Sequence, residues 1–179
     1  MDISLGKDNA LHLQGRGVSM AIGPSLLTKA DVFFTTNGIE PKIEVDKYFQ
    51  GAGEYEVQGV MVDGVATGKG VTSYHVIAES ISLAAVTLNK AEDLTDDMLE
   101  SLQPSKVLVL WLAEGSVQDV AQLMSRFDVG RLIPAKIPCD IDSLEKELQL
   151  KAETVSRLKL TPKDNIEEIR LLTVLDEVQ

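Results

Sequence analysis

The feature that most constrains the fold of this chain is the apolar run "KVLVLWLA" at residues 106–113. After Lys106 the run contains no polar residue that could face water. A run of this kind is typical of a β-strand that is buried on both faces of its sheet. The chain is therefore expected to form a sheet that other elements cover on both sides.

The segments on either side of this strand differ in character. Before Leu88, short apolar and β-branched runs follow one another between glycine-containing turns, which predicts strands and hairpins. After Leu88, strands alternate with helices. Thr95 has the character of a helix N-cap, residues 117–127 carry apolar residues at helical spacing, and Asp142 with Glu145 resembles a capping signal for a third helix.

Length and composition fit one sheet-rich domain with helices on its outer faces. The 179 residues are 44% hydrophobic and 25% charged, which is enough to bury a sizeable core. No repeat, low-complexity segment or linker divides the chain, so a single domain over residues 1–179 is expected. The net charge of −11 repels phosphate backbones and anionic lipids, and so argues against nucleic-acid and membrane binding.

The sequence predicts a cytoplasmic protein. Its first residues, "MDISLGKDNALHLQG", lack the basic segment and apolar core of a signal peptide. The longest strongly apolar run is far too short to cross a bilayer. Cys139 is the single cysteine, which allows no internal disulfide and is interpreted as an inert thiol.

Residues that could carry chemistry are few. No phosphate-binding loop or Gly-x-Ser-x-Gly elbow occurs, and the two histidines, His12 and His75, fall within predicted strands. Glu54 and Glu56 share one face of a predicted strand. They could bind a cation or act as acid and base, or they could form a solvated strand edge, and both interpretations stay open.

The segment "GAGEYEVQGVMVDGV" at residues 51–65 carries a resemblance to a known family. It resembles the Gly-Pro-Gly-Glu-Tyr-Glu segment of small metallo-β-lactamase-fold hydrolases, the group similar to L-ascorbate-6-phosphate lactonase. Weaker matches keep the family's order along nearly the whole chain. The resemblance implies an αββα sandwich: two mixed sheets with helices on the outer faces. It also implies a metal site made of a His-x-His-x-Asp-His loop, two further histidines and a bridging Asp.

The resemblance places those metal ligands on residues of other types. The loop positions fall on Asn37, Ile39, Pro41 and Lys42, the later histidines on Lys69 and Lys136, and the bridging Asp on Asn89. The acidic residue that often precedes the family's first proline is Gly23 here. Histidine and carboxylate ligands hold the metals that make hydroxide from water at neutral pH. No metal cofactor and no ordinary metal-dependent hydrolysis are therefore expected.

Three of the replacing residues, Lys42, Lys69 and Lys136, are cationic. Their ammonium groups could supply part of the positive charge of a metal, which suggests that the former metal site binds a phosphate or a carboxylate. Alternatively, the lysines are the result of drift and are solvated or paired with Glu40, Glu54 or Glu56.

Two functional interpretations follow from the sequence. The first is a non-catalytic binding or interaction module for an anionic ligand or a protein partner, with a homo-oligomer allowed. The second is a metal-independent enzyme that uses the lysines with Glu54 and Glu56; a desolvated lysine would be its nucleophile or base. Enzymatic activity thus stays open, and the first interpretation is favoured.

Overall fold

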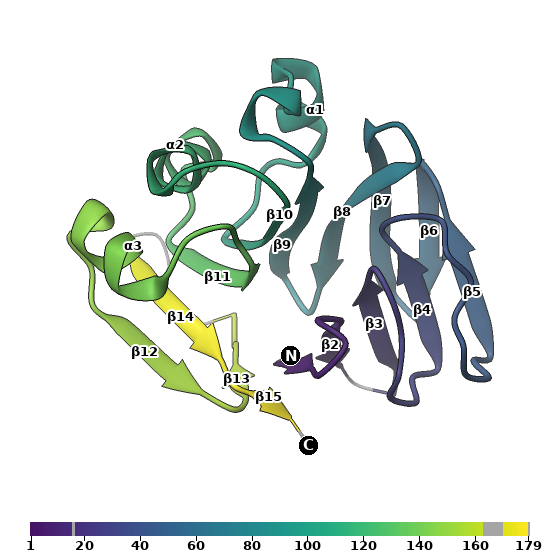
Figure 1. Ribbon diagram of the computed structural model, residues 1–179. Coiled ribbons are helices and arrows are strands. Elements are labelled where there is room, and N and C mark those ends of the chain that lie inside the picture. Colours follow the sequence, from purple (N-terminus) through teal and green to yellow (C-terminus); the bar gives the residue numbers. More distant parts are fainter. Residues whose placement is uncertain (16, 163–169, 179) are drawn as a thin grey trace.

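Two β-sheets stacked face to face form the body of the protein in the computed structural model, which describes residues 1–15, 17–162 and 170–178 (Figure 1). The first sheet has the order β13-β1-β2-β3-β4-β5, with β15 also beside β1. Its strands are β1 (Asp2–Gly6), β2 (Leu11–Gln14), β3 (Ser19–Gly23), β4 (Val32–Thr35), β5 (Lys47–Gln50), β13 (Leu158–Lys159) and β15 (Glu177–Val178).

The second sheet has eight strands in the order β12-β14-β11-β10-β9-β8-β7-β6. They are β6 (Gly53–Val57), β7 (Val60–Gly68), β8 (Val71–Ala78), β9 (Ile81–Leu88), β10 (Val107–Leu112), β11 (Arg131–Lys136), β12 (Ala152–Val155) and β14 (Leu171–Leu175). Neighbouring strands from β6 to β9 pair antiparallel, and neighbouring strands from β9 through β10, β11 and β14 to β12 pair parallel, so the sheet is mixed.

The apolar run singled out in the sequence is β10, in the middle of the second sheet. All six of its residues are buried, and it pairs in parallel with β9 and β11. Val109 faces the first sheet, whereas Leu108 faces the helices. The prediction of a strand covered on both faces is confirmed.

The described helices lie together on the outer face of the second sheet (Figure 1). They are η1 (Ala91–Asp93), α1 (Asp96–Ser101), α2 (Val117–Phe127) and α3 (Ile141–Leu148). Helix α2 buries Val120, Leu123 and Phe127 against this sheet, as the helical spacing of its apolar residues predicts.

Loops cover the outer face of the first sheet in the described part of the chain. Leu26 and Ala30 from the β3–β4 loop pack beside Phe33, and Ile43 and Val45 from the β4–β5 loop join them. Between the sheets lies a larger apolar layer to which both sheets contribute. The two-sheet sandwich expected from the resemblance is thus observed, and loops and helices close its two outer faces.

The helix caps agree with the sequence prediction at the first helix and correct it at the third. Thr95 accepts a hydrogen bond from Met98 N, and Ser116 caps α2. The third helix begins after Asp140, whose carboxylate accepts from Ser143 N at 2.8 Å. The predicted capping signal at Asp142 and Glu145 is therefore wrong, because Glu145 Oε1 instead accepts from Ala152 N.

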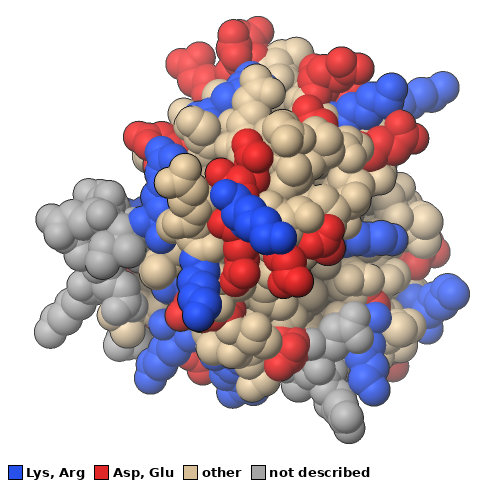
Figure 2. Space-filling view, turned by 60° about the vertical axis from the view of Figure 1, so that its left-hand side comes forward, with Lys and Arg blue, Asp and Glu red and all other residues tan. Residues whose placement is uncertain are grey.

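Charged side chains of both signs are interspersed on the face shown in Figure 2, despite the net charge of −11. Within residues 1–15, 17–162 and 170–178, no helix combines the length and apolar character that crossing a bilayer requires.

Candidate functional site

One end of the sandwich holds some of the positions that the resemblance assigns to a metal site. Parallel strands β9, β10 and β11 end there. The β7–β8 turn lies at the same end, because β8 runs antiparallel to both β7 and β9. Strand β4 of the first sheet ends at the same place, since Thr36 O accepts from Thr72 N at 2.9 Å. We call this end of the sandwich the C-terminal strand edge. In sheets with parallel strands, ligands commonly bind at this end.

The structure places four of the seven assigned positions at the C-terminal strand edge. Asn37 follows β4, Lys69 is in the β7–β8 turn, Asn89 follows β9, and Lys136 ends β11.

The other three positions, Ile39, Pro41 and Lys42, lie in the β4–β5 loop. This loop leads away from the edge, because Ile43 packs on the outer face of the first sheet and β5, parallel to β4, begins at the opposite end. Lys42 immediately precedes Ile43 and is directed away from Lys69 and Lys136 by this path.

Asn37 shapes the loop in which it lies. Its Oδ1 accepts hydrogen bonds from Thr35 Oγ1 at 3.0 Å and from Ile39 N at 3.1 Å. Gly38 between them has a φ of +71°, a left-handed conformation that glycine adopts without strain. The amide oxygen of Asn37 is thus engaged in closing a turn, and Ile39 projects its side chain into solvent with 57% exposure.

A cluster of hydroxyl groups holds the strands together below this edge. Thr67 Oγ1 lies 2.9 Å from Ser73 Oγ and 2.8 Å from Thr87 O, and Thr87 N donates to Ser73 Oγ at 2.9 Å. The backbone ladder between β8 and β9 stops at Tyr74 and Ala85. Beyond that point, the hydrogen bonds of Thr67 and Ser73 connect the strands. This cluster is not predicted from the sequence, in which the density of Thr and Ser near the strand ends is its only signal.

Two buried hydroxyls at this end have no hydrogen-bond partner. They are Thr36 Oγ1 and Thr87 Oγ1, for which no described residue provides a partner. A buried hydroxyl without a partner costs about 1–3 kcal/mol, so such groups call for a structural or functional explanation.

The side chains of the C-terminal strand edge do not fit a divalent metal. The ammonium groups of Lys69 and Lys136 cannot act as ligands, and the side-chain oxygen of Asn37 is already engaged in two hydrogen bonds. In the described ranges, no three His, Cys, Asp or Glu side chains come together in a group that could hold a metal ion.

The lysines offer positive charge instead. Lys42, Lys69 and Lys136 are exposed, and none forms an ion pair or hydrogen bond with a described residue. Lys69 lies at the tip of a turn, followed by Gly70 with a φ of +71°. The expected alternative of pairing with Glu40, Glu54 or Glu56 is not observed among the described residues.

The "GAGEYEV" segment serves the fold. Tyr55 points into the core, where its ring meets Phe34 at 5.5 Å, and its hydroxyl donates to the carbonyls of Gln50 and Gly51 at 3.1 and 3.0 Å. The alternating Glu54 and Glu56 therefore face outward and are exposed. In the cross-strand register Glu54 lies opposite Asp63, another acid.

Both histidines lie away from the C-terminal strand edge. His75 is buried under the α1–β10 connection, with Nε2 3.0 Å from Pro104 O and Nδ1 3.8 Å from Asp63 Oδ2. His12 lies on the outer face of the first sheet, where burial lowers its pKa despite the nearby Asp8. Cys139 packs beside α3, and burial raises the pKa of its thiol, as expected for an unreactive cysteine.

Comparisons with known proteins give matches in structure alone. No family model matches the chain, and no curated protein matches it. A solved structure of a protein of the metallo-β-lactamase superfamily from Thermotoga maritima matches with a TM-score of 0.77 at 16% identity, over 98% of this chain and 100% of that one.

Two further solved structures agree. An isothiocyanate hydrolase from Delia radicum gut bacteria gives a TM-score of 0.61 at 10% identity, covering 97% of this chain and 96% of that one. The metallo-β-lactamase fold protein YhfI from Bacillus subtilis gives 0.59 at 7% identity, covering 97% and 95%. At these identities the comparison establishes architecture and leaves chemistry open. The chain has the metallo-β-lactamase fold.

Proposed function

We propose that this protein is a non-catalytic member of the metallo-β-lactamase fold that lacks the family's metal ligands and binds an anion at the C-terminal strand edge. The observation that carries the proposal is the position of Lys69 and Lys136 at that edge without an ionic partner among the described residues. We further propose that the protein belongs to the L-ascorbate-6-phosphate lactonase-like group, on the basis of the "GAGEYEV" segment.

Electrostatics supports this assignment. In a chain of net charge −11, lysines that form no ion pair with a described residue are available to attract an anion. An ammonium binds phosphate or carboxylate as a point charge, without demanding a fixed geometry. Lys69 comes from the β7–β8 turn and Lys136 from the end of β11, so positive charge is supplied to this edge from two parts of the second sheet, with β9 and β10 between them. Lys42 lies in the β4–β5 loop, which leads away from this edge, so its ammonium group could approach a bound anion only from the margin of the site.

The hydroxyl groups at the same end complement the lysines. The buried hydroxyls of Thr36 and Thr87 have no hydrogen-bond partner among the described residues. Hydroxyls are donors as well as acceptors and so suit an oxyanion better than a zinc ion, which prefers histidine and thiolate. The proposed role is that of a binding module for an anionic ligand, or for a partner protein that presents an anionic group. We place this module in the cytoplasm and regard it as a single domain.

Thermal unfolding in the presence of inorganic phosphate tests the proposal. Because a ligand that binds only the folded state raises the melting temperature, we expect a rise of about 3–5 °C at roughly ten times Kd. The rise is expected to disappear in Lys69→Gln and Lys136→Gln. Lys151→Gln is the matched control, since Lys151 is also exposed but precedes β12 at the opposite end of the second sheet.

An equal rise in all three variants would reflect the general stabilising effect of phosphate on folded proteins and would remove the proposal. A second experiment tests the proposed absence of a metal site. It measures the metal content of the purified protein by elemental mass spectrometry after dialysis against zinc and manganese. We expect no stoichiometric metal. A stoichiometric metal would restore metal-dependent hydrolysis as the leading function.

A further inference from the structure

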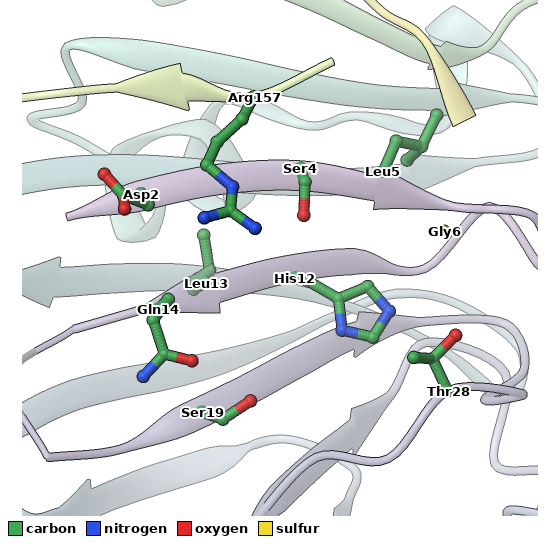
Figure 3. Close-up of a pocket in the computed structure, with 10 residues that line it drawn as sticks. All are labelled: Asp2, Ser4, Leu5, Gly6, His12, Leu13, Gln14, Ser19, Thr28 and Arg157. Atoms are coloured by element: carbon green, nitrogen blue, oxygen red, sulfur yellow. The ribbon is translucent and has the colours of Figure 1, made fainter. Parts of the chain in front are cut away.

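A polar hollow lies on the outer face of the first sheet, away from the C-terminal strand edge. It has a volume of about 260 Å³ and opens over β1, β2 and β3 (Figure 3). The residues that line it are Asp2, Ser4, Leu5, Gly6, His12, Leu13, Gln14, Ser19, Thr28 and Arg157.

The alternation of side chains along the strands builds the floor of this hollow. Ile3 and Leu13 point into the core between the sheets, so their neighbours Ser4, His12 and Gln14 point outward. In the cross-strand register Ser4 lies opposite His12, and Gln14 lies between Asp2 and Ser19. Polar groups therefore stand side by side on three adjacent strands.

Arg157 supplies the cation of the hollow. It comes from the two-residue connection between β12 and β13, and its guanidinium reaches over β1 toward Ser4 (Figure 3). It forms no ion pair or hydrogen bond with a described residue. A guanidinium offers five donors in a planar fork that matches a carboxylate.

His12 supplies a neutral acceptor. Its Nε2 is buried, has no hydrogen-bond partner among the described residues and lies toward Asp8. Burial lowers the pKa of His12, so the ring is neutral at pH 7. In a neutral imidazole one ring nitrogen donates and the other accepts, so the ring of His12 can offer an acceptor to a hydroxyl group in the hollow.

Size and charge narrow the class of ligand. At roughly 30 Å³ for each water, the hollow has room for about eight or nine waters, or a molecule of about six to nine non-hydrogen atoms. Arg157 is the one cation among the lining residues and attracts a carboxylate, whereas the carboxylate of Asp2 in the same lining disfavours a ligand with more than one negative charge. The hydroxyls of Ser4, Ser19 and Thr28, with the ring of His12, offer donors and acceptors for hydroxyl groups.

We propose that this hollow binds a small hydroxycarboxylate, with its carboxylate on Arg157 and its hydroxyls toward Ser4 and His12. The site is separate from the lysines of the C-terminal strand edge, and the inference does not depend on the function proposed for that edge.

Titration of ¹⁵N-labelled protein with glycerate, followed by amide chemical shifts, tests the inference. We expect saturable shifts at residues 2–6, 12–14 and 157. Arg157→Gln is expected to weaken binding by about tenfold or more, since a charge-assisted hydrogen bond is lost. Arg170→Gln is the control, because Arg170 is likewise exposed but lies across the molecule beside Asp128. It is expected to leave the affinity unchanged.

The neutral analogue glycerol and inorganic phosphate complete the test. Both are expected to bind at least about tenfold more weakly than glycerate. Glycerol lacks the negative charge that pairs with Arg157, and the carboxylate of Asp2 repels the greater negative charge of phosphate. Absence of saturable shifts, equal weakening by both arginine variants, or shifts confined to Lys69 and Lys136 would overturn the inference. Arg157 is exposed, so loss of folding in Arg157→Gln is not expected; the dispersion of the amide spectrum verifies this directly.

Discussion

Tyr55 shows how a single residue fixes the corner at which the chain passes from one sheet to the other. Its ring packs against Phe34 and Phe49, and its hydroxyl satisfies the carbonyls of Gln50 and Gly51. Gly64 on the neighbouring strand leaves room for the backbone of this corner. A Cβ on Gly64 would lie 2.6 Å from Gly51 O and 3.2 Å from the ring of Tyr74.

Replacing Gly64 with alanine is therefore expected to destabilise the fold. The clashing atom belongs to the backbone, so the corner itself must shift, and overpacking of this kind costs about 1–3 kcal/mol. Urea unfolding of Gly64→Ala measures the loss. Gly15→Ala is the control, since its Cβ would meet no atom closer than 3.6 Å. Equal stability of the two variants would contradict this account of the corner.

At the scale of elements, a polar cluster joins three strands at the far side of the second sheet. Arg131 on β11 donates to Glu153 on β12 and to Thr173 on β14 between them. Arg131 is buried, and no described residue forms a hydrogen bond with its Nε, whereas the side chain of Glu153 is 46% exposed. Burial alone would raise the pKa of Glu153, but hydrogen bonds from Arg131 and Thr173 outweigh it and lower the pKa below the ordinary value of 4.5.

This lowered pKa predicts a dependence of stability on pH. A carboxyl whose pKa is lower in the folded than in the unfolded state stabilises the fold fully above its unfolded value. The stabilisation is lost as the pH falls below about 4.5 and through the folded pKa. We expect Glu153→Gln to flatten the acid side of the stability profile, modestly because solvent screens the half-exposed group. Denaturant unfolding at several pH values measures this, and an unchanged acid limb would contradict it.

Elements were predictable from the sequence where the pattern is local. Strand β10 follows from its unbroken apolar run, and α2 from apolar spacing together with its cap at Ser116. The start of α3 was misjudged because Asp140 and Asp142 are both chemically able to cap. Only the hydrogen bond to Ser143 distinguishes them.

The candidate site was predictable only in part. The strand ends that carry Asn37, Asn89 and Lys136 follow from sequence order. The course of the loop that bears Lys42 depends on contacts of Ile43 with the first sheet, which no local pattern encodes. The hollow around Arg157 likewise depends on two distant segments that meet only in the folded chain.

At the scale of the whole molecule, Trp111 links the two sheets. It is 4% exposed, and its indole Nε1 donates to Asn9 O in the β1–β2 turn at 2.8 Å. The apolar layer between the sheets draws residues from both ends of the sequence, from Ile3 to Leu175. Both sheets contribute side chains to this one inner layer, so separating the sheets would expose it on both sides. The two sheets are therefore expected to unfold together.

The single tryptophan provides the measurement. If residues 1–179 form one cooperative domain, unfolding followed by Trp111 fluorescence and by far-ultraviolet circular dichroism will have the same midpoint and slope. Two separate transitions would contradict a single domain. Trp111→Phe, which removes the bond to Asn9, is expected to lower the midpoint in circular dichroism.

The connections between the sheets have a consequence for self-association. The chain passes from β5 to β6 at one side through residues 51–52, and from β12 to β13 at the other through residues 156–157. The outermost strands thus meet in pairs at two shared corners, and each has five residues or fewer. Short strands anchored in this way offer a second molecule little free backbone on which to add a strand. The fold is in this respect protected against growth into fibres, and copies of the chain that associate are expected to do so through side chains of their faces.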